Sequence, residues 1–305
     1  MKAVIEEIRE FASEKGIIWG VCDGAPLSFA EKFARIDTPF VDFSFEERTC
    51  PEKTMKSVKS IIVVGGFYGA APNAPSDGKG RCSLSSGMAG EDYHVVMRGL
   101  LKELEGRIAR RATFASAIFV DNGPLMERAL ALKSGLGFFG KNSFVINRGR
   151  GSFFNIGYMM TNLELPATSP ESAGFELCEK TCGDNPLCEK ACPGKALNSK
   201  NTPVMDFKKC VSYLTQKKEP LDARESAMIG SRLMGCDVCQ RVCPFNAGVE
   251  KDYENEFFPL ISDILEMTNA SFNRRFKRTA AGWRGKKTFA RNALIALNNL
   301  NDADE

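Results

Sequence analysis

Eight of the eleven cysteines in this chain fall into two groups whose spacing is typical of metal or iron–sulfur ligands. Each group ends in the pattern C-x3-C-P, because Pro193 follows Cys192 and Pro244 follows Cys243. Bacterial ferredoxins with two 4Fe-4S clusters end their cysteine runs in this way, and the last cysteine of each run binds the other cluster. This crossed pattern predicts a first cluster on Cys178, Cys182, Cys188 and Cys243, and a second cluster on Cys192, Cys210, Cys236 and Cys239.

An all-cysteine zinc site is the main alternative, since structural zinc also accepts four thiolates in two closely spaced pairs. The chain has one histidine, His94, which excludes mixed Cys/His zinc sites but leaves all-Cys sites open. The repeated C-x3-C-P pattern and the total of eight cysteines favour iron–sulfur clusters. Cys22, Cys50 and Cys82 have no suitably spaced partner and are interpreted as ordinary thiols, and His94 is interpreted as structural rather than catalytic.

The composition, with 43% hydrophobic and 26% charged residues, is that of a soluble globular protein. No segment reaches the ~18 uninterrupted apolar residues that a membrane-spanning helix needs. The N-terminus, "MKAVIEEIREFASEKG", is charged and is neither a signal peptide nor a twin-arginine leader. We therefore expect a cytoplasmic protein without membrane contact, in which thiols stay reduced and disulfides are rare.

The cysteine groups follow a long segment that mixes strands with helices. Apolar runs at residues 60–68 and 112–120 predict buried strands. Apolar residues at helical spacing predict helices over residues 91–110 and 124–134. Residues 142–161 contain a glycine turn between two apolar runs, which predicts two further strands.

Three parts follow from this pattern: residues 1–165 of mixed structure, residues 175–248 with the eight cysteines, and a helical segment over residues 249–305. A Pro- and Ser-containing stretch at 163–174 is predicted to be a linker between the first two parts. Residues 69–90 are rich in Gly, Ser, Pro and Ala, and a loop of this length is usually functional or disordered.

Basic residues are concentrated near the C-terminus. Between Met267 and Asn301 there are eight Lys or Arg and no acidic residue, although the net charge of the whole chain is only +3. A basic block of this kind indicates an anionic partner such as nucleic acid. A solvated helical face is the alternative. The eight residues are Arg274, Arg275, Lys277, Arg278, Arg284, Lys286, Lys287 and Arg291.

The chain resembles the epoxyqueuosine reductases, which are cobalamin-dependent iron–sulfur enzymes that finish queuosine in tRNA. The resemblance runs in order from about residue 57 to residue 299. It is carried by "SVKSIIVVGGFY", "GEDYH", "FVDNGPLMERALALKSGLGFFGKNSFVI", "GSFF", "CVSYLTQ", "GCDVCQRVCPFN" and "RRFKRTAAGWRGKKTFARNALIALNN". It implies an α+β protein with an N-terminal α/β cobalamin-binding domain related to reductive dehalogenases. A ferredoxin-like domain with two 4Fe-4S clusters and a short C-terminal helical segment, a truncated helical repeat, would follow.

The resemblance also implies the activity: reduction of epoxyqueuosine to queuosine in tRNA, the last step of queuosine biosynthesis. Electrons would pass from the 4Fe-4S clusters to cobalamin. The matched motif "VDNGP" makes Asp121 the counterpart of the family's proton donor. Residues that match motifs lining the cobalamin side of the pocket are Lys141, Asn142, Ser143, Ser152 and Phe153. The expected partners are tRNA carrying epoxyqueuosine and a low-potential electron donor, and the expected state is a monomer.

Two other functions stay open from the sequence. A corrinoid and iron–sulfur reductase of another small substrate, such as a reductive dehalogenase, would use the same cofactors without needing the basic block. A non-catalytic electron carrier would not need the long first domain. Two motifs also depart from the family pattern: the first cysteine group is more widely spaced, and "LSSGMA" precedes "GEDYH" in place of an Arg-Tyr-Ala motif.

Overall fold

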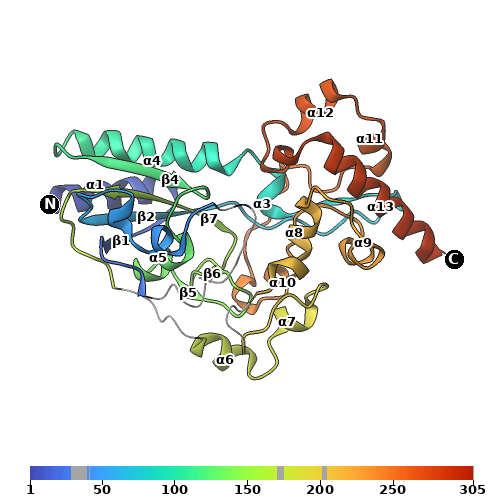
Figure 1. Ribbon diagram of the computed structural model, residues 1–305, viewed down its shortest axis with the longest axis horizontal. Coiled ribbons are helices and arrows are strands. Elements are labelled where there is room, and N and C mark those ends of the chain that lie inside the picture. The colour runs from blue at the N-terminus through green and yellow to red at the C-terminus, as the bar shows by residue number, and fades with distance from the viewer. Residues whose placement is uncertain (29–39, 41, 170–174, 201–204, 305) are drawn as a thin grey trace.

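The computed structural model describes residues 1–28, 40, 42–169, 175–200 and 205–304. Two lobes make up the molecule (Figure 1): an α/β lobe that contains the N-terminus and a helical lobe that contains the C-terminus. The helices that carry the cysteine motifs lie along one side, next to both lobes. The α+β class predicted from the sequence matches this arrangement.

The α/β lobe is built on a four-stranded antiparallel sheet with strand order β1-β2-β7-β4. Its strands are β1 (Ile18–Asp23), β2 (Ser60–Phe67), β7 (Phe154–Thr161) and β4 (Ser116–Val120). Along β2 the side chains alternate between two cores, with Ile61 and Val63 on one face and Ile62 and Val64 on the other. Both faces are covered, so β2 after Ser60 is a continuous apolar run, as the predicted buried strand requires.

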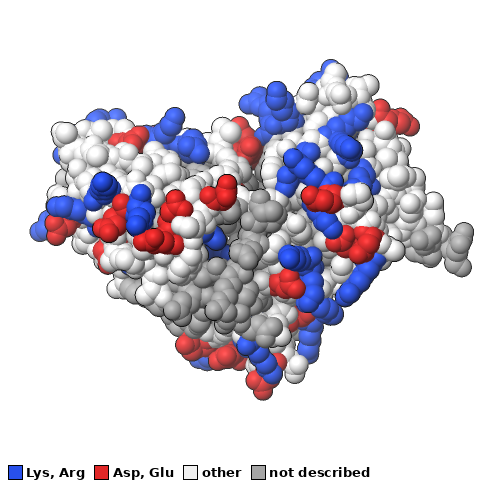
Figure 2. Space-filling model, in the orientation of Figure 1, with Lys and Arg blue, Asp and Glu red and all other residues white. Residues whose placement is uncertain are grey.

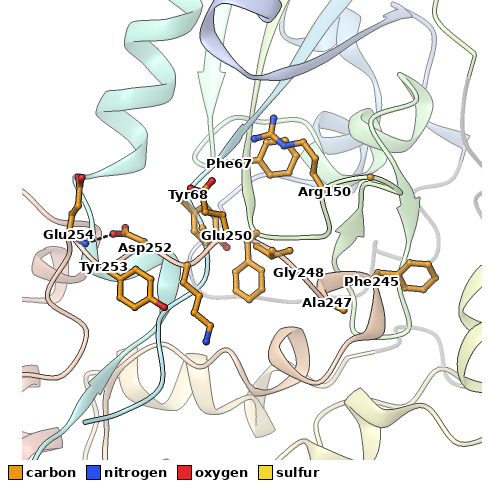
Figure 3. Close-up of a pocket in the computed structure, with 15 residues that line it drawn as sticks. Phe67, Tyr68, Arg150, Phe245, Ala247, Gly248, Glu250, Asp252, Tyr253 and Glu254 are labelled. Atoms are coloured by element: carbon orange, nitrogen blue, oxygen red, sulfur yellow. Dashed lines mark hydrogen bonds between the residues drawn. The ribbon is translucent and has the colours of Figure 1, made fainter.

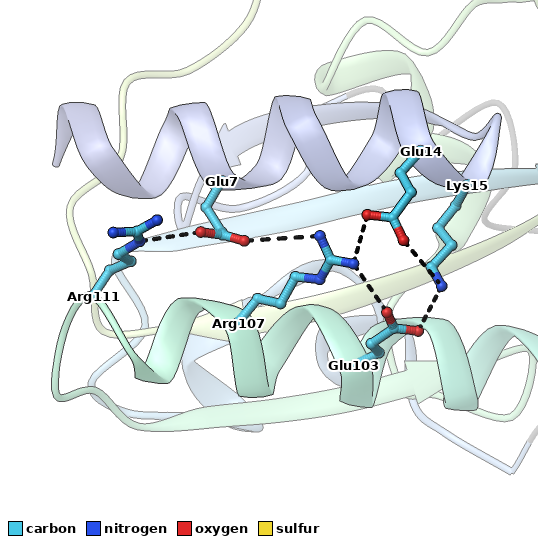
Figure 4. Close-up of polar contacts among 6 residues, drawn as sticks. All are labelled: Glu7, Glu14, Lys15, Glu103, Arg107 and Arg111. Atoms are coloured by element: carbon cyan, nitrogen blue, oxygen red, sulfur yellow. Dashed lines mark hydrogen bonds and ion pairs between the residues drawn. The ribbon is translucent and has the colours of Figure 1, made fainter.

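Helices α1 (Lys2–Lys15) and α4 (Tyr93–Ala109) cover one face of the sheet, and α5 (Glu127–Lys133) covers the other. Ion pairs join α1 to α4 on their outer side (Figure 4): Arg107 of α4 lies 2.7 Å from Glu14 and 3.2 Å from Glu103, and Lys15 lies 2.9 Å from Glu103. The Arg107 guanidinium also lies over the Phe11 ring, 4.9 Å from its centre. This network joins the N-terminal helix to α4.

Residues 69–90 leave the α/β lobe and pack in the helical lobe. They contain β3 (Ser83–Leu84), which pairs in parallel with β8 (Arg232–Met234), and α3 (Ser86–Ala89). Leu84 shares an apolar core with Phe257 and Phe289. The segment predicted as a functional or disordered loop is therefore ordered, and it joins the first part of the chain to the C-terminal part.

The remaining elements are mostly helical, as predicted for the C-terminal part, and all except the 19-residue α13 are short. Before the cysteine motifs lie α2 (Phe45–Thr49), η2 (Pro51–Lys53), β5 (Phe138–Phe139) and β6 (Val145–Ile146). The cysteine segment contains α6 (Glu176–Cys182), α7 (Leu187–Ala191), η3 (Phe207–Lys209), α8 (Val211–Gln216), α9 (Ala223–Ile229), α10 (Val238–Arg241) and η4 (Pro244–Asn246). The C-terminal segment contains α11 (Ile261–Glu266), α12 (Asn269–Phe276), η5 (Ala280–Arg284) and α13 (Lys286–Asp304).

The two strands predicted within residues 142–161 are present as β6 and β7, but they do not pair with each other. β6 pairs with β5, and β7 joins the main sheet between β2 and β4. Of the predicted linker, residues 170–174 lie outside the described residues, whereas Thr168 hydrogen-bonds the α/β lobe at Val21 and Ser134. None of the helices in the described part of the chain is long and apolar enough to cross a membrane.

Candidate active site and cluster centres

Asp121 lies directly after β4, on a turn that the surrounding residues hold in a defined shape. Its backbone has φ +56°, a left-handed conformation that aspartate tolerates better than most residues. Two residues on, a Cβ at Gly123 would lie 2.4 Å from the Tyr158 hydroxyl, so only glycine fits there. The same hydroxyl accepts a hydrogen bond from the Leu125 N–H at 3.1 Å. The end of the sheet therefore presents the Asp121 side chain, which is about half exposed.

Three polar side chains surround Asp121. Its backbone N–H donates to Glu127 Oε1 at 2.5 Å, and its Oδ2 lies 3.2 Å from His94 Nε2. The other imidazole nitrogen, His94 Nδ1, lies 2.7 Å from Asp92 Oδ1. The Tyr93 ring stacks on the imidazole with 4.2 Å between ring centres, and its hydroxyl hydrogen-bonds Asp121. A carboxylate therefore faces each nitrogen of the only histidine in the chain.

The pKa values in this group shift in line with their surroundings. Burial raises the pKa of Glu127 to about 8, and the negative charge of Asp121 adds to this effect. The pKa of His94 is raised, chiefly by its hydrogen bond to Asp121 and also by the one to Asp92, against the opposing effect of burial. Burial and the neighbouring Asp121 carboxylate raise the pKa of Tyr93 as well.

The Asp121 side chain faces a cavity of about 1010 Å³ whose walls come from all three parts of the chain. The first part contributes Asp121, Tyr93, His94 and Arg98, together with neighbouring residues. The end of α8 and the residues after it contribute Tyr213, Gln216, Lys217, Lys218 and Glu219. From the C-terminal segment come Ala280, Trp283 and Arg284. Arg284 stacks on the half-exposed Trp283, 3.7 Å from its ring centre.

The four cysteines predicted to hold the first cluster line one small pocket. Cys178 and Cys182 come from α6, Cys188 from α7, and Cys243 from the residue before η4. Burial, and after it the nearby Cys243 and Cys178, raise the pKa of the Cys188 thiol to about 12. Each thiol disfavours the ionisation of the others, because close negative charges repel one another. The positively charged iron of a cluster offsets this repulsion and allows all four to bind as thiolates.

The other four cysteines form a second group beside the first. Cys192, Cys210 and Cys236 all raise the pKa of the Cys239 thiol, although burial has the largest effect. Cys210 immediately precedes α8, whose Tyr213 and Gln216 line the cavity that Asp121 faces. The second group is therefore connected to that cavity through this helix. The structure brings together both sets of four that the crossed pattern predicts, and the assignment of each thiol as a ligand stays a prediction.

The five residues matched to cobalamin contacts are buried but do not meet in one place. Lys141 and Asn142 line the pocket of the first cysteine set. Ser143 accepts a hydrogen bond from Arg128, and Ser152 donates one to Gln240. Phe153 lines a different pocket of about 630 Å³, shown in Figure 3, between Tyr68 and residues 247–254. None of the five lines the cavity at Asp121, so their role as cobalamin contacts stays a prediction.

Sequence reasoning did not single out the residues around Asp121. His94 was interpreted as structural, yet its imidazole lies beside Asp121. Glu127 and Trp283 lie in the matched motifs "PLMERALALKS" and "GWRGKK" without a role assigned to them. The sequence offered one signal for these residues: two titratable side chains lie close together in each motif. They are Asp92 and His94 in "GEDYH", and Asp121 and Glu127 in "VDNGPLMER".

Two families of known proteins match the chain. Residues 175–246 match the family described as 4Fe-4S double cluster binding domain, and residues 48–122 match the family described as Epoxyqueuosine reductase QueG, DUF1730. The first match confirms the prediction of two 4Fe-4S clusters over the zinc alternative.

Whole-chain relatives agree with these matches. The epoxyqueuosine reductase of Lactococcus garvieae is 32% identical, over 99% of this chain and 88% of the relative. That of Staphylococcus aureus is 33% identical, over 84% of this chain and 68% of the relative.

Solved structures confirm the fold. The epoxyqueuosine reductase of Streptococcus thermophilus matches with a TM-score of 0.88 and 32% identity, over 100% of this chain and 83% of that chain. An epoxyqueuosine reductase solved with an epoxyqueuosine-modified tRNA-Tyr stem loop matches with a TM-score of 0.88 and 29% identity, over 99% and 83% of the two chains. This chain belongs to the epoxyqueuosine reductase family.

Proposed function

We propose that this chain reduces epoxyqueuosine to queuosine in tRNA, with electrons passing from two 4Fe-4S clusters to cobalamin. The observation that carries the proposal is the cavity at Asp121. Asp121 contributes a carboxyl group to its lining, and Tyr213, three residues after Cys210 of the second cysteine set, lines the same cavity. Proton donor and electron source thus reach one space from two parts of the chain. The relative solved with a modified tRNA stem loop supports tRNA as the substrate.

The cavity suits a large cofactor. Its volume of about 1010 Å³ is at the upper end of the range for small-molecule and cofactor sites. Among the described residues, Arg284 Nε is buried there without a hydrogen-bond partner, so this N–H is available to an oxygen of a bound group. Cobalamin, when bound, supplies two electrons at a single centre, although each cluster delivers them singly. Tyr213, Gln216 and Arg284 are the residues we expect to hold it.

Asp121 has the proton-donor role in this reaction. Conversion of an epoxide to an alkene breaks two C–O bonds and releases the oxygen as water, with two electrons and two protons consumed. The leaving oxygen must be protonated, because an oxide or hydroxide is a poor leaving group. Asp121 lies on a turn held by Gly123 and Tyr158, so its carboxyl is presented by a rigid scaffold. In a related enzyme, that of Bacillus subtilis, an aspartate lies on a catalytic loop that can swing out of the active site.

Basic side chains around the cavity provide the tRNA contact. Figure 2 shows Lys and Arg side chains gathered on the lobe that carries α8 and α11–α13. Two of the eight basic residues between Met267 and Asn301 are used inside the protein: Arg275 pairs with Glu256 and Asp263, and Arg291 donates to backbone carbonyls. Arg284 is assigned to the cofactor, so five are available to phosphates. Each contact should make the log–log slope of affinity against salt more negative by about 0.7 to 0.9. An affinity that does not depend on salt would contradict this role.

An anaerobic turnover assay tests the proposed function. Cluster-loaded protein would be incubated with cobalamin, a strong reductant and epoxyqueuosine-containing tRNA, and the digested nucleosides would be weighed by mass spectrometry. Queuosine formation that depends on added cobalamin supports the proposal, and D121N should lower kcat by about 100-fold or more. Protein with both clusters and cobalamin bound that forms no queuosine would contradict it and favour a reductase of another small substrate. We further propose that a low-potential donor reduces the clusters, and that the enzyme is a cytoplasmic monomer.

A further inference from the structure

The proton count of the proposed reaction points to a second proton source, and the following inference rests on that function. Both protons consumed in one turnover end on the same oxygen, which leaves as water. The first opens the epoxide to an alcohol, and the second converts the hydroxyl into a leaving water molecule. Asp121 carries one proton at a time. It must therefore be protonated again within the same turnover, while the substrate covers the cavity.

His94 lies in the position to do this. Its Nε2 is 3.2 Å from Asp121 Oδ2, and its Nδ1 is 2.7 Å from Asp92 Oδ1, so the three side chains form a line. Both neighbours are carboxylates and only accept hydrogen bonds when ionised, so the imidazole satisfies both when it carries two protons. The Tyr93 ring, stacked on the imidazole, keeps the ring plane in this orientation.

We propose that His94 supplies the second proton to Asp121, and that Asp92 orients the imidazole for the transfer. In this step the His94 Nε2–H bond breaks and an O–H bond forms on Asp121 Oδ2, so the imidazolium becomes neutral and the carboxylate becomes a carboxylic acid. The Nδ1–H stays hydrogen-bonded to Asp92. No electrons move. Asp121 and His94 both end the turnover deprotonated, and two protons from water restore the carboxylic acid and the imidazolium between turnovers, because the His94 side chain is 29% exposed.

A purely structural role does not explain the imidazole. Asp92 caps the N-terminus of α4 through the His94 backbone N–H, at 3.0 Å, and any residue at position 94 supplies that group. The imidazole instead extends to the Asp121 turn, which belongs to a different element.

The charges around the imidazole also favour its protonated form. Asp92 and Asp121 face it directly. The basic residues that line the same cavity are Arg98, Lys217, Lys218 and Arg284. The raised pKa of His94 agrees with this balance.

The coupling of His94 to Asp121 can be measured directly, since the protein contains one histidine. Protein labelled with 13C-histidine gives one Cε1 signal, which can be followed by NMR against pH in the cluster-loaded, oxidised enzyme. We expect its midpoint to lie above the ordinary histidine pKa of about 6.5 and to fall in both D121N and D92N. An ordinary midpoint that D121N leaves unchanged would overturn the proposal.

Turnover measurements test the proton supply itself. H94Q should lower kcat about 10-fold to 100-fold with little change in KM, and the alkaline limb that His94 sets in the wild-type pH profile should disappear. Added imidazole should restore part of the rate. V95A, at an exposed neighbour on the same helix, is the matched control and should behave as wild type. If the wild-type enzyme forms queuosine and H94Q has the same rate and the same pH profile, the inference about His94 is overturned and the proposed function stands. A wild-type enzyme that forms no queuosine would overturn the proposed function, and with it this inference.

Discussion

Replacing Glu127 by glutamine should stabilise the protein at neutral pH. Burial, together with the charge of Asp121, raises the pKa of Glu127 from 4.5 to about 8. The folded protein therefore keeps this carboxyl protonated in a pH range where the unfolded chain releases the proton. The unfolded state binds fewer protons there, so the free energy of unfolding falls as pH rises from about 4.5 to about 8 and is level above that range.

The size of this effect follows from the same two pKa values. Each pH unit between them costs about 1.4 kcal/mol, so Glu127 destabilises the fold by up to about 3 kcal/mol at pH 7. E127Q removes this cost, and its amide oxygen can still accept the Asp121 N–H. For a protein of this length, 3 kcal/mol corresponds to an increase in Tm of about 5 °C.

Thermal unfolding followed by circular dichroism, without oxygen and at several pH values between 5 and 8, measures the difference. We expect E127Q to exceed wild type by an amount that grows with pH and is small at pH 5. E164Q, at a side chain that is 85% exposed, is the control and should show no such trend. Equal Tm values for E127Q and wild type at both pH 5 and pH 8 would refute the claim that the folded protein raises the pKa of Glu127.

Two further predictions test other parts of the molecule. The double variant C178A/C243A should lose one cluster and keep the other, because both cysteines line one pocket. The iron content should fall to about half, and one electron paramagnetic resonance signal should remain. Loss of both clusters would contradict the crossed assignment. R107L should lower Tm more than R9L does, because Arg107 joins α1 to α4 whereas Arg9 pairs only within α1. That difference should shrink in high salt, and equal effects of both variants would contradict the role of the network.

Local patterns in the sequence predicted the elements that depend on local physics. The continuous apolar run of β2 predicts a strand buried on both faces, and Met97, Leu101, Leu104 and Ile108 of α4 are all buried, as their helical spacing predicts. The grouping of the cysteines into two sets of four was predictable, because in runs that end in C-x3-C-P the last cysteine of each run binds the cluster of the other run.

Features that depend on distant pairing were not predictable. Residues 69–90 are polar and rich in glycine, yet they are ordered by partners some 150 residues away: the Ser83 N–H donates to Ser231, and the Ser86 N–H and hydroxyl to Asp237. The surroundings of Asp121 were missed for the same reason. Nothing near His94 or Glu127 in the sequence shows that a left-handed turn after β4 will bring Asp121 to both.

The proposed reaction assigns the delivery of electrons and the delivery of protons to different parts of the cavity lining. Tyr213 and Gln216, on the helix that begins after Cys210, line the cavity on the cluster side. Asp121 and His94 line it from the α/β lobe, at the ends of β4 and α4. A carboxylic acid or imidazolium in contact with a strongly reducing centre would lose protons to it in unproductive reduction. In the proposed reaction, electrons and protons would reach the epoxide from different parts of the chain, so neither delivery would pass through the residues of the other.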